Sequence, residues 1–206
     1  MKLYLVRHGE TSLNKKGCYY GKTDAVLSKK GIEQAEYLRK IFTSISFDYV
    51  VASPLVRAYN TAQIVLGERE QEIFGDSRLM EQDFGIFEGL TYEELCSTYP
   101  AELEQWNKEF SSYRIPEGES FLDVRRRVEA FLKDIPLGEQ TKKETMLIAA
   151  HKGTLGHLLA AMLKLPLEGY WNFVFEQGCY SEVDLEDGYA IIRKLNAREI
   201  PEKFEV

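Results

Sequence analysis

Three short, largely apolar runs divide the chain, and each ends abruptly at polar or charged residues. They cover residues 3–6, 48–52 and 146–150. Runs of this length, rich in aliphatic and β-branched residues, are typical of buried parallel strands. Ligands of open α/β sheets bind outside the carboxyl ends of such strands, so the side chains that follow the runs are expected to share one crevice. Those side chains are Arg7, His8, Arg57 and His151.

Capping residues mark where the helices between these strands should begin. The predicted starts are Ser28, Ser53 followed by Pro54, Thr91 with Glu94, Pro100, and Ser120 with Asp123. Such side chains accept hydrogen bonds from the first free N–H groups of a helix, and proline fits its first position. Apolar residues then recur at helical spacing, which predicts helices that cover a sheet. A last helix is expected over residues 155–165, where His157 is interpreted as structural.

The tail of the chain has a different period. Residues 178–196 alternate around Asp187-Gly188, a dipeptide that favours a two-residue hairpin turn. We therefore expect a β-hairpin at the edge of the sheet. Because an exposed edge can pair with a second copy of the chain, a homodimer is one hypothesis.

Length and charge narrow the class of protein. A chain of 206 residues is long enough for one α/β domain with a substantial core. Its net charge is −7, and its largest basic cluster is the run Arg125-Arg126-Arg127. This balance argues against nucleic acid or an anionic membrane as a partner. The three arginines are expected to form a solvated helix face.

Cysteine usage favours a cytoplasmic protein. Cys18, Cys96 and Cys179 are odd in number and widely spaced, with no pattern of a disulfide framework, as in a reducing compartment. The apolar run at residues 3–6 is far too short for a secretory signal, and no stretch has the length of a membrane span.

The predicted crevice suits a small, dense anion. Two arginines and two histidines would meet there, and arginine binds phosphate through two parallel hydrogen bonds. Arg57 falls in the first turn of a helix, where a cation opposes the helix dipole unless an anion is bound beside it. The alternatives are that Arg57 pairs with a surface carboxylate and that the strands merely end in polar loops.

Five motifs, in order along the chain, give these residues a family context. They are Arg7-His8-Gly9-Glu10-Thr11 with Asn14; residues 52–58 with Thr61-Ala62; Glu81 ahead of Phe84-Gly85; Glu88-Gly89; and His151 with Gly153. Together they resemble the histidine phosphatase superfamily, which includes phosphoglycerate mutases. Within it the chain looks most like small bacterial phosphatases of the α-ribazole phosphatase type. The resemblance extends from the N-terminus to about Gly156.

This resemblance implies an α/β fold, a three-layer αβα sandwich. A mostly parallel central sheet would carry helices on both faces and the C-terminal hairpin on its edge. Residues 1–206 would form a single domain, with a short helical lid inserted at about residues 91–119. The lid contains seven acidic residues against two basic ones, so it should repel extra negative charge. Its aromatic residues either pack on the substrate or belong to the core.

The resemblance also implies catalytic roles. His8 would attack phosphorus and form a phosphohistidine, and Glu81 would act as general acid and base. From the residues alone, Glu81 and Glu88 are equal candidates for the second role. Arg7, Arg57 and His151 would hold the phosphate oxygens.

Further substrate-binding candidates come from loops. Asn14, Tyr20, Gly21 and Thr23 lie in the loop after the first strand and are expected to face the pocket, Asn14 as a further phosphate ligand. Lys152 departs from the family pattern, in which glycine commonly follows the second histidine. It would add a phosphate contact or alter access to the site.

The predicted activity is metal-independent hydrolysis of a small phosphorylated metabolite, without cofactor. With three histidines and no HxxxH pair, the chain shows no metal-ligand set. α-Ribazole 5′-phosphate is one candidate substrate; sugar phosphates, phosphoserine and broad specificity are others. Alternative functions are a phosphoglycerate mutase, which needs more cations in the lid, and a catalytically idle module that binds a phosphorylated ligand.

Overall fold

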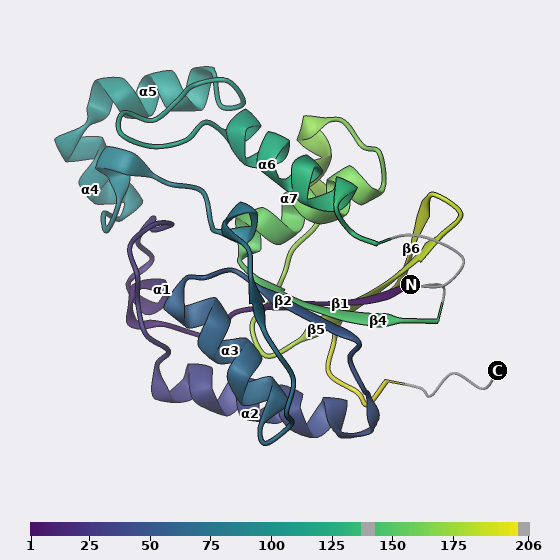
Figure 1. Cartoon of the computed structure of the whole chain (residues 1–206). Coiled ribbons are helices and arrows are strands. Elements are labelled where there is room, and N and C mark those ends of the chain that lie inside the picture. The colour runs from purple at the N-terminus through teal and green to yellow at the C-terminus, as the bar shows by residue number, and fades with distance from the viewer. Residues whose placement is uncertain (137–142, 202–206) are drawn as a thin grey trace.

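The computed structural model of the chain describes residues 1–136 and 143–201. They surround one sheet with strand order β3-β2-β4-β1-β5-β6 (Figure 1). Its strands are β1 (Lys2–Arg7), β2 (Tyr49–Ala52), β3 (Phe74–Gly75), β4 (Thr145–Ala150), β5 (Tyr180–Glu186) and β6 (Tyr189–Ala197). Strands β1 to β4 run parallel, and β5 and β6 add antiparallel. The three predicted strands are therefore neighbours, with β4 between β1 and β2.

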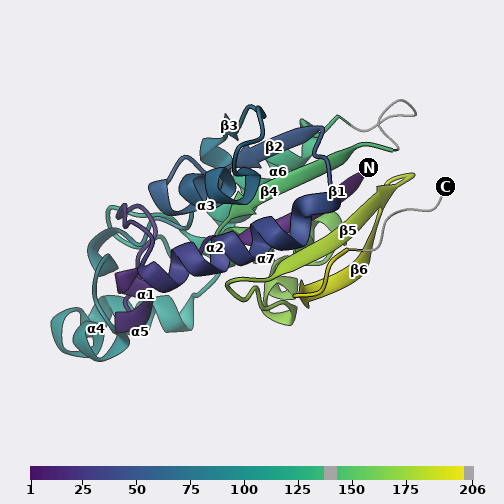
Figure 2. The same ribbon diagram turned by 90° about the horizontal axis from the view of Figure 1, so that it is seen from below.

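Helices cover both faces of this sheet, as predicted for a three-layer αβα sandwich. One face carries α2 (Lys29–Ile41) and α3 (Val56–Leu66), and the other carries α6 (Phe121–Lys133) and α7 (Lys152–Met162) (Figures 1 and 2). Three shorter helices lie beyond the carboxyl ends of the parallel strands: α1 (Ser12–Lys16), α4 (Tyr92–Thr98) and α5 (Pro100–Lys108). Short 3-10 helices are η1 (Phe42–Ser44), η2 (Ser77–Leu79), η3 (Gly85–Phe87) and η5 (Leu167–Asn172).

Alternate side chains of β1 enter two different cores. Leu3 and Leu5 pack into the core beside α6 and α7. Tyr4 and Val6 pack into the core beside α2 and α3. This is the period of two of a strand that is buried on both faces. A third cluster joins α4 and α5 to the preceding loop and contains Phe87, Leu95, Leu103, Trp106 and Ile115. The segment predicted as a lid thus has a small core of its own.

Four of the five predicted helix starts are confirmed, among them Pro100 at the first position of α5. Ser28, Thr91 and Ser120 each accept a hydrogen bond from a first-turn N–H, and the last two form capping boxes. The prediction for Ser53 is wrong, because α3 begins only at Val56.

The N-terminus of α3 is capped from elsewhere in the chain. Its N-cap, Leu55, has no side-chain cap. Instead, the N–H of Val56 donates to Asp24 Oδ1 at 2.9 Å, 32 residues away along the chain. A capping partner so distant in sequence leaves no local signal.

Two helix boundaries differ from the sequence analysis. Helix α1 was not expected, although Thr11 and Asn14 form its capping box. Helix α7 begins at Lys152, directly after β4 and His151, rather than at residue 155. Its first N–H groups therefore open onto the carboxyl end of the sheet.

The C-terminal hairpin is confirmed. Asp187 and Gly188 have φ values of 48° and 80°, which suit the two central positions of a type I′ turn. Strand β6 forms one edge of the sheet, and its pairing with a second copy stays a prediction. Within the described ranges, no helix combines the length and the apolar character needed to cross a bilayer. Cys18, Cys96 and Cys179 are free thiols.

Candidate active site

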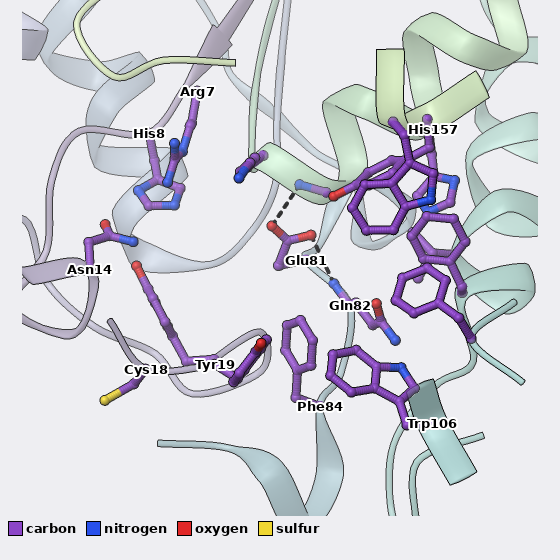
Figure 3. A pocket seen from close by; sticks show the side chains of 18 of the residues that line it. Arg7, His8, Asn14, Cys18, Tyr19, Glu81, Gln82, Phe84, Trp106 and His157 are labelled. Carbon is purple, nitrogen blue, oxygen red and sulfur yellow. Dashed lines mark hydrogen bonds between the residues drawn. The ribbon is translucent and has the colours of Figure 1, made fainter. Parts of the chain in front are cut away.

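A cavity of about 550 Å³ lies at the carboxyl end of the sheet (Figure 3). Polar side chains gather at one end and aromatic side chains at the other, with Glu81 between them. Three of the four side chains predicted to converge line the cavity, namely Arg7, His8 and Arg57. The parallel strands therefore bring residues from distant parts of the chain together at the carboxyl end of the sheet.

His8 follows β1 directly, and only 3% of it is exposed. Its Nδ1 lies 2.8 Å from the carbonyl oxygen of Gly9. Because a carbonyl oxygen only accepts, Nδ1 carries the proton and the lone pair is on Nε2. Burial, and then the positive charges of Arg57 and Arg7, lower the pKa of His8 to about 3. The imidazole is neutral at neutral pH, as a nucleophile must be.

His151 is buried beside this group and has the opposite tautomer. Its Nδ1 accepts a hydrogen bond from Arg57 Nε at 3.2 Å, so its Nε2 carries the proton and donates to Ser53 Oγ at 2.8 Å. Burial, followed by the charge of Arg57, lowers the pKa of His151 well below its usual value. The ring centroids of His151 and His8 are 5.1 Å apart. His151 lies behind the cavity wall rather than in its lining.

The guanidinium of Arg57 is fully buried, and backbone carbonyls hold it. It donates to the carbonyl oxygens of Thr23 and Gly21 at 2.9 and 2.7 Å. The ring of Tyr20, which also lines the cavity, packs 4.6 Å from its Cζ. Within residues 1–136 and 143–201 its hydrogen bonds go to these carbonyls and to His151, so the alternative of a surface carboxylate is wrong. A buried cation without a bonded carboxylate favours an anionic ligand.

The loop that supplies these carbonyls is held from the other side by Glu88. Its carboxylate accepts hydrogen bonds from the N–H groups of Gly21, Lys22 and Thr23 at 2.7, 3.0 and 3.0 Å. Gly21 and Thr23 were predicted to face the pocket, but the lining does not include them. They act instead through their backbone, as supports for Arg57.

Arg7 and Asn14 keep hydrogen-bond donors for a ligand. Arg7 donates from one terminal nitrogen to the carbonyl oxygen of Phe175 at 2.9 Å, while its buried Nε has no partner among the described residues. Asn14 Oδ1 accepts from the N–H of Thr11 and from Gln177 Nε2. The amide nitrogen of Asn14 remains, and Figure 3 shows it on the cavity side.

Glu81 lies at the N-terminus of α7. Its carboxylate accepts hydrogen bonds from the N–H groups of Gly153 at 3.0 Å and Thr154 at 3.2 Å, and from the N–H of Gln82 at 3.1 Å. The positive end of a helix dipole is a favourable place for a carboxylate. A Cβ at Gly153 would lie 2.4 Å from Glu81 Oε1. Glycine at this position therefore lets the carboxylate reach the helix end.

The arginine run of α6 is not the solvated face that we expected. Arg126 is exposed, with 68% of its side chain accessible, whereas Arg125 and Arg127 are only 11% and 17% accessible. Arg125 donates to the carbonyl oxygen of Leu165 at 3.0 Å. Arg127 reaches the loop that carries Glu81. Sequence position alone does not show which arginines of a run turn inward.

The far end of the cavity is lined by planar side chains. They are Phe84, Trp106, Phe110, Phe121, Tyr170 and Trp171. His157 belongs to this group as well, with its ring 4.1 Å from that of Phe121 and 4.8 Å from that of Tyr170. It packs among these rings and also lines the cavity, which the interpretation of His157 as structural did not include. Burial, followed by the charge of Arg125, lowers its pKa to about 3, so its ring is neutral.

Lys152 lines the cavity from the first position of α7. Among the described lining residues it is the one cation besides Arg7 and Arg57. Its predicted contact with phosphate stays a prediction.

Several lining residues were not identified from the sequence. Tyr170 and Trp171 come from η5, and Gln82, Asn107, Cys18 and Tyr19 come from loops and α5. The adjacent aromatic residues at 170–171 were the signal that the sequence offered. In the structure 61% of Trp171 is exposed. Burial, then the charge of Glu81, raises the pKa of Tyr170, so its hydroxyl stays protonated. In the described part of the chain, no group of three or more His, Cys, Asp or Glu side chains is arranged to hold a metal ion.

Comparison with known proteins places these features in a family. Residues 3–198 match the Histidine phosphatase superfamily (branch 1). The adenosylcobalamin/α-ribazole phosphatase of Escherichia coli K12 is 34% identical over 200 residues, 97% of this chain and 98% of that protein. Phosphoserine phosphatase 1 of Hydrogenobacter thermophilus is 31% identical over 196 residues, 95% of this chain and 92% of its own length.

Solved structures agree with this match. The crystal structure of the α-ribazole phosphatase from Shigella flexneri superposes with a TM-score of 0.92 at 35% identity. The superposition covers 99% of this chain and 100% of that one.

Proposed function

The chain belongs to the histidine phosphatase superfamily, and we propose that it hydrolyses a phosphomonoester whose leaving group carries a planar ring. α-Ribazole 5′-phosphate is the substrate that fits best. One observation carries the proposal: a single cavity joins a cationic, histidine-bearing end to an aromatic end, with Glu81 between them (Figure 3).

The first step is phosphoryl transfer to His8. Arg7, Arg57 and Asn14 bind the phosphate oxygens with their free donors and neutralise charge in the transition state. The Nε2 lone pair of His8 attacks phosphorus as the bond to the leaving alkoxide breaks. A phosphohistidine forms, which divides one difficult displacement into two easier ones.

Glu81 serves both steps from its place beside α7. As an acid it protonates the departing alkoxide, which leaves as an alcohol toward the aromatic end. As a carboxylate it then takes a proton from water, whose oxygen attacks the phosphohistidine. Inorganic phosphate is released, and neutral His8 is restored.

His151 supports the phosphate end. It holds Arg57 through its Nδ1, and its ring lies beside that of His8. We infer that it acts mainly by fixing the guanidinium and that it approaches the phosphoryl group once that group is on His8.

The aromatic end favours a ring-bearing leaving group. Stacking on planar side chains contributes about 0.5–1.5 kcal/mol per ring pair beyond burial. The similar proteins named as α-ribazole phosphatases support this choice.

Two other functions have less support. A phosphoglycerate mutase must hold a bisphosphorylated cofactor, and Lys152 is the one additional cation among the described lining residues. A catalytically idle module would not need the tautomer that leaves Nε2 of His8 unprotonated.

The test is phosphate release, in the presence of EDTA, from α-ribazole 5′-phosphate, phosphoserine, 3-phosphoglycerate and p-nitrophenyl phosphate. We expect the highest kcat/KM for α-ribazole 5′-phosphate and no turnover by His8→Ala. Equal, slow cleavage of all four would refute the ring-bearing substrate, and turnover by His8→Ala would refute the phosphohistidine. Inhibition by EDTA that added metal reverses would refute the metal-free mechanism.

A further inference from the structure

Arg127 lies outside the cavity lining, yet its side chain hydrogen-bonds to the backbone of the loop that carries Glu81. From α6 it donates to the carbonyl oxygens of Arg78 and Met80 at 2.7 and 2.6 Å. It also donates to the carbonyl oxygen of Glu81 itself at 3.1 Å. One guanidinium thus fixes three carbonyls within four consecutive residues.

Glu119 completes this set of hydrogen bonds from the other side of the loop. It forms a two-point ion pair with Arg127, at 2.9 Å to Nε and 3.0 Å to a terminal nitrogen. Its carboxylate also accepts the N–H of Asp83 at 3.0 Å, and its own N–H donates to the carbonyl oxygen of Asp83 at 2.8 Å. The pair therefore holds the backbone on both sides of Glu81.

We infer that Arg127, oriented by Glu119, is a positioning residue for the acid–base step at Glu81. A flexible loop would let the carboxylate drift from the leaving oxygen, and a fork of five fixed donors is suited to prevent that. A lysine places one point charge and cannot reach the carboxylate and three carbonyls together. The inference rests on the proposed role of Glu81.

The test separates proton donation from every other contribution. Benzyl phosphate and p-nitrophenyl phosphate both carry a ring, but benzyl alkoxide needs a proton to leave and p-nitrophenolate does not. The parameter kcat/KM reports the transition state of the first chemical step. The ratio of kcat/KM for benzyl phosphate to kcat/KM for p-nitrophenyl phosphate therefore measures the contribution of proton donation. A loss of folded protein lowers both values equally.

We expect Arg127→Met to lower kcat/KM for benzyl phosphate by about 100-fold, the usual cost of a misplaced catalytic group. For p-nitrophenyl phosphate we expect a change of no more than about threefold, because its anion leaves without help. Arg127→Lys should behave like Arg127→Met. The matched control is Arg126→Met, which removes the same charge from the exposed neighbour and should leave the ratio unchanged.

A double variant shows whether the effect passes through Glu81. In a Glu81→Gln background, Arg127→Met should not change the ratio further. If Arg127→Met fails to fold, Glu119→Gln breaks the same pair and should lower the ratio as well. The inference is overturned if Arg127→Met, or Glu119→Gln in its place, lowers kcat/KM equally for both substrates. It is also overturned if Arg127→Met still lowers the ratio in the Glu81→Gln background.

The failure of the proposed function looks different. If Glu81→Gln alone leaves the ratio unchanged, the acid role of Glu81 falls, and this inference falls with it. Loss of all turnover in His8→Ala would still support phosphoryl transfer to His8. If His8→Ala keeps wild-type turnover, the phosphatase mechanism itself fails.

Discussion

Replacing Gly153 by alanine should lower activity while changing stability little. A Cβ at this position would lie 2.4 Å from Glu81 Oε1, roughly 1 Å inside ordinary van der Waals contact. The carboxylate is the end of a flexible side chain, so it moves and the backbone of α7 stays. In moving, it leaves the N–H of Thr154, which now lies 3.2 Å from Oε1.

The expected effect on activity is large, and the expected effect on stability is small. A displacement of about 1 Å in a catalytic group costs on the order of 100-fold in rate, so kcat/KM for benzyl phosphate should fall by that factor. Alanine is the better helix former by up to about 1 kcal/mol. The lost hydrogen bond to Thr154 costs about 0.5–1.5 kcal/mol, so the two contributions oppose each other. The free energy of unfolding should therefore change by no more than about 1.5 kcal/mol.

The assay pairs kcat/KM for benzyl phosphate with urea unfolding of the same preparations. Gly75→Ala is the control, because the atom nearest to its new Cβ is 3.9 Å away and neither quantity should change. Wild-type activity in Gly153→Ala would refute the reasoning that the place of the carboxylate matters. A loss of stability well beyond about 1.5 kcal/mol, together with a loss of activity, would show that the helix, rather than Glu81, had moved.

Three further predictions concern charge and stacking. Burial and nearby arginines lower the pKa values of His8, His157 and His151, so the unfolded chain takes up protons below about pH 6.5 while the folded chain does not. The free energy of unfolding should then decrease by up to about 1.4 kcal/mol per histidine for each pH unit below about 6.5. Equal urea midpoints at about pH 7.5 and about pH 5.5 would contradict this. Glu88→Ala removes the acceptor of three loop N–H groups. It should lower the free energy of unfolding in urea by about 2 kcal/mol and raise KM. An unchanged KM would show that the loop does not need the Glu88 carboxylate. Trp106→Ala should lower kcat/KM for ring-bearing substrates roughly tenfold and leave phosphoserine unchanged, and an equal loss on both would exclude a stacking role.

Much of the fold was readable because its signals are local. The apolar runs that became β1, β2 and β4 carry their strand signal within four to six residues. Capping boxes and the Asp187-Gly188 turn likewise depend on neighbours in the chain. Ser53 was the exception: its hydroxyl bonds to His151 Nε2, a partner 98 residues away, instead of capping a helix.

The candidate site divides in the same way. By itself, the sequence determined that Arg7, His8, Arg57 and His151 would meet, because parallel strands place their carboxyl ends at one edge. The physical reason is that strand period and helix capping act over a few residues, so they are written in the local pattern.

Only the tertiary structure decided the surroundings of these groups. The residues taken alone left Glu81 and Glu88 equal, and the structure places Glu81, not Glu88, in the cavity lining. It also turned Arg127 toward the loop of Glu81, left Arg126 in solvent and brought His157 into the aromatic end. Each outcome depends on contacts between distant segments, such as that of Gly153 with Glu81, 72 residues apart in the chain. Contacts of this range are set by how the layers pack, and no local period of the sequence records them.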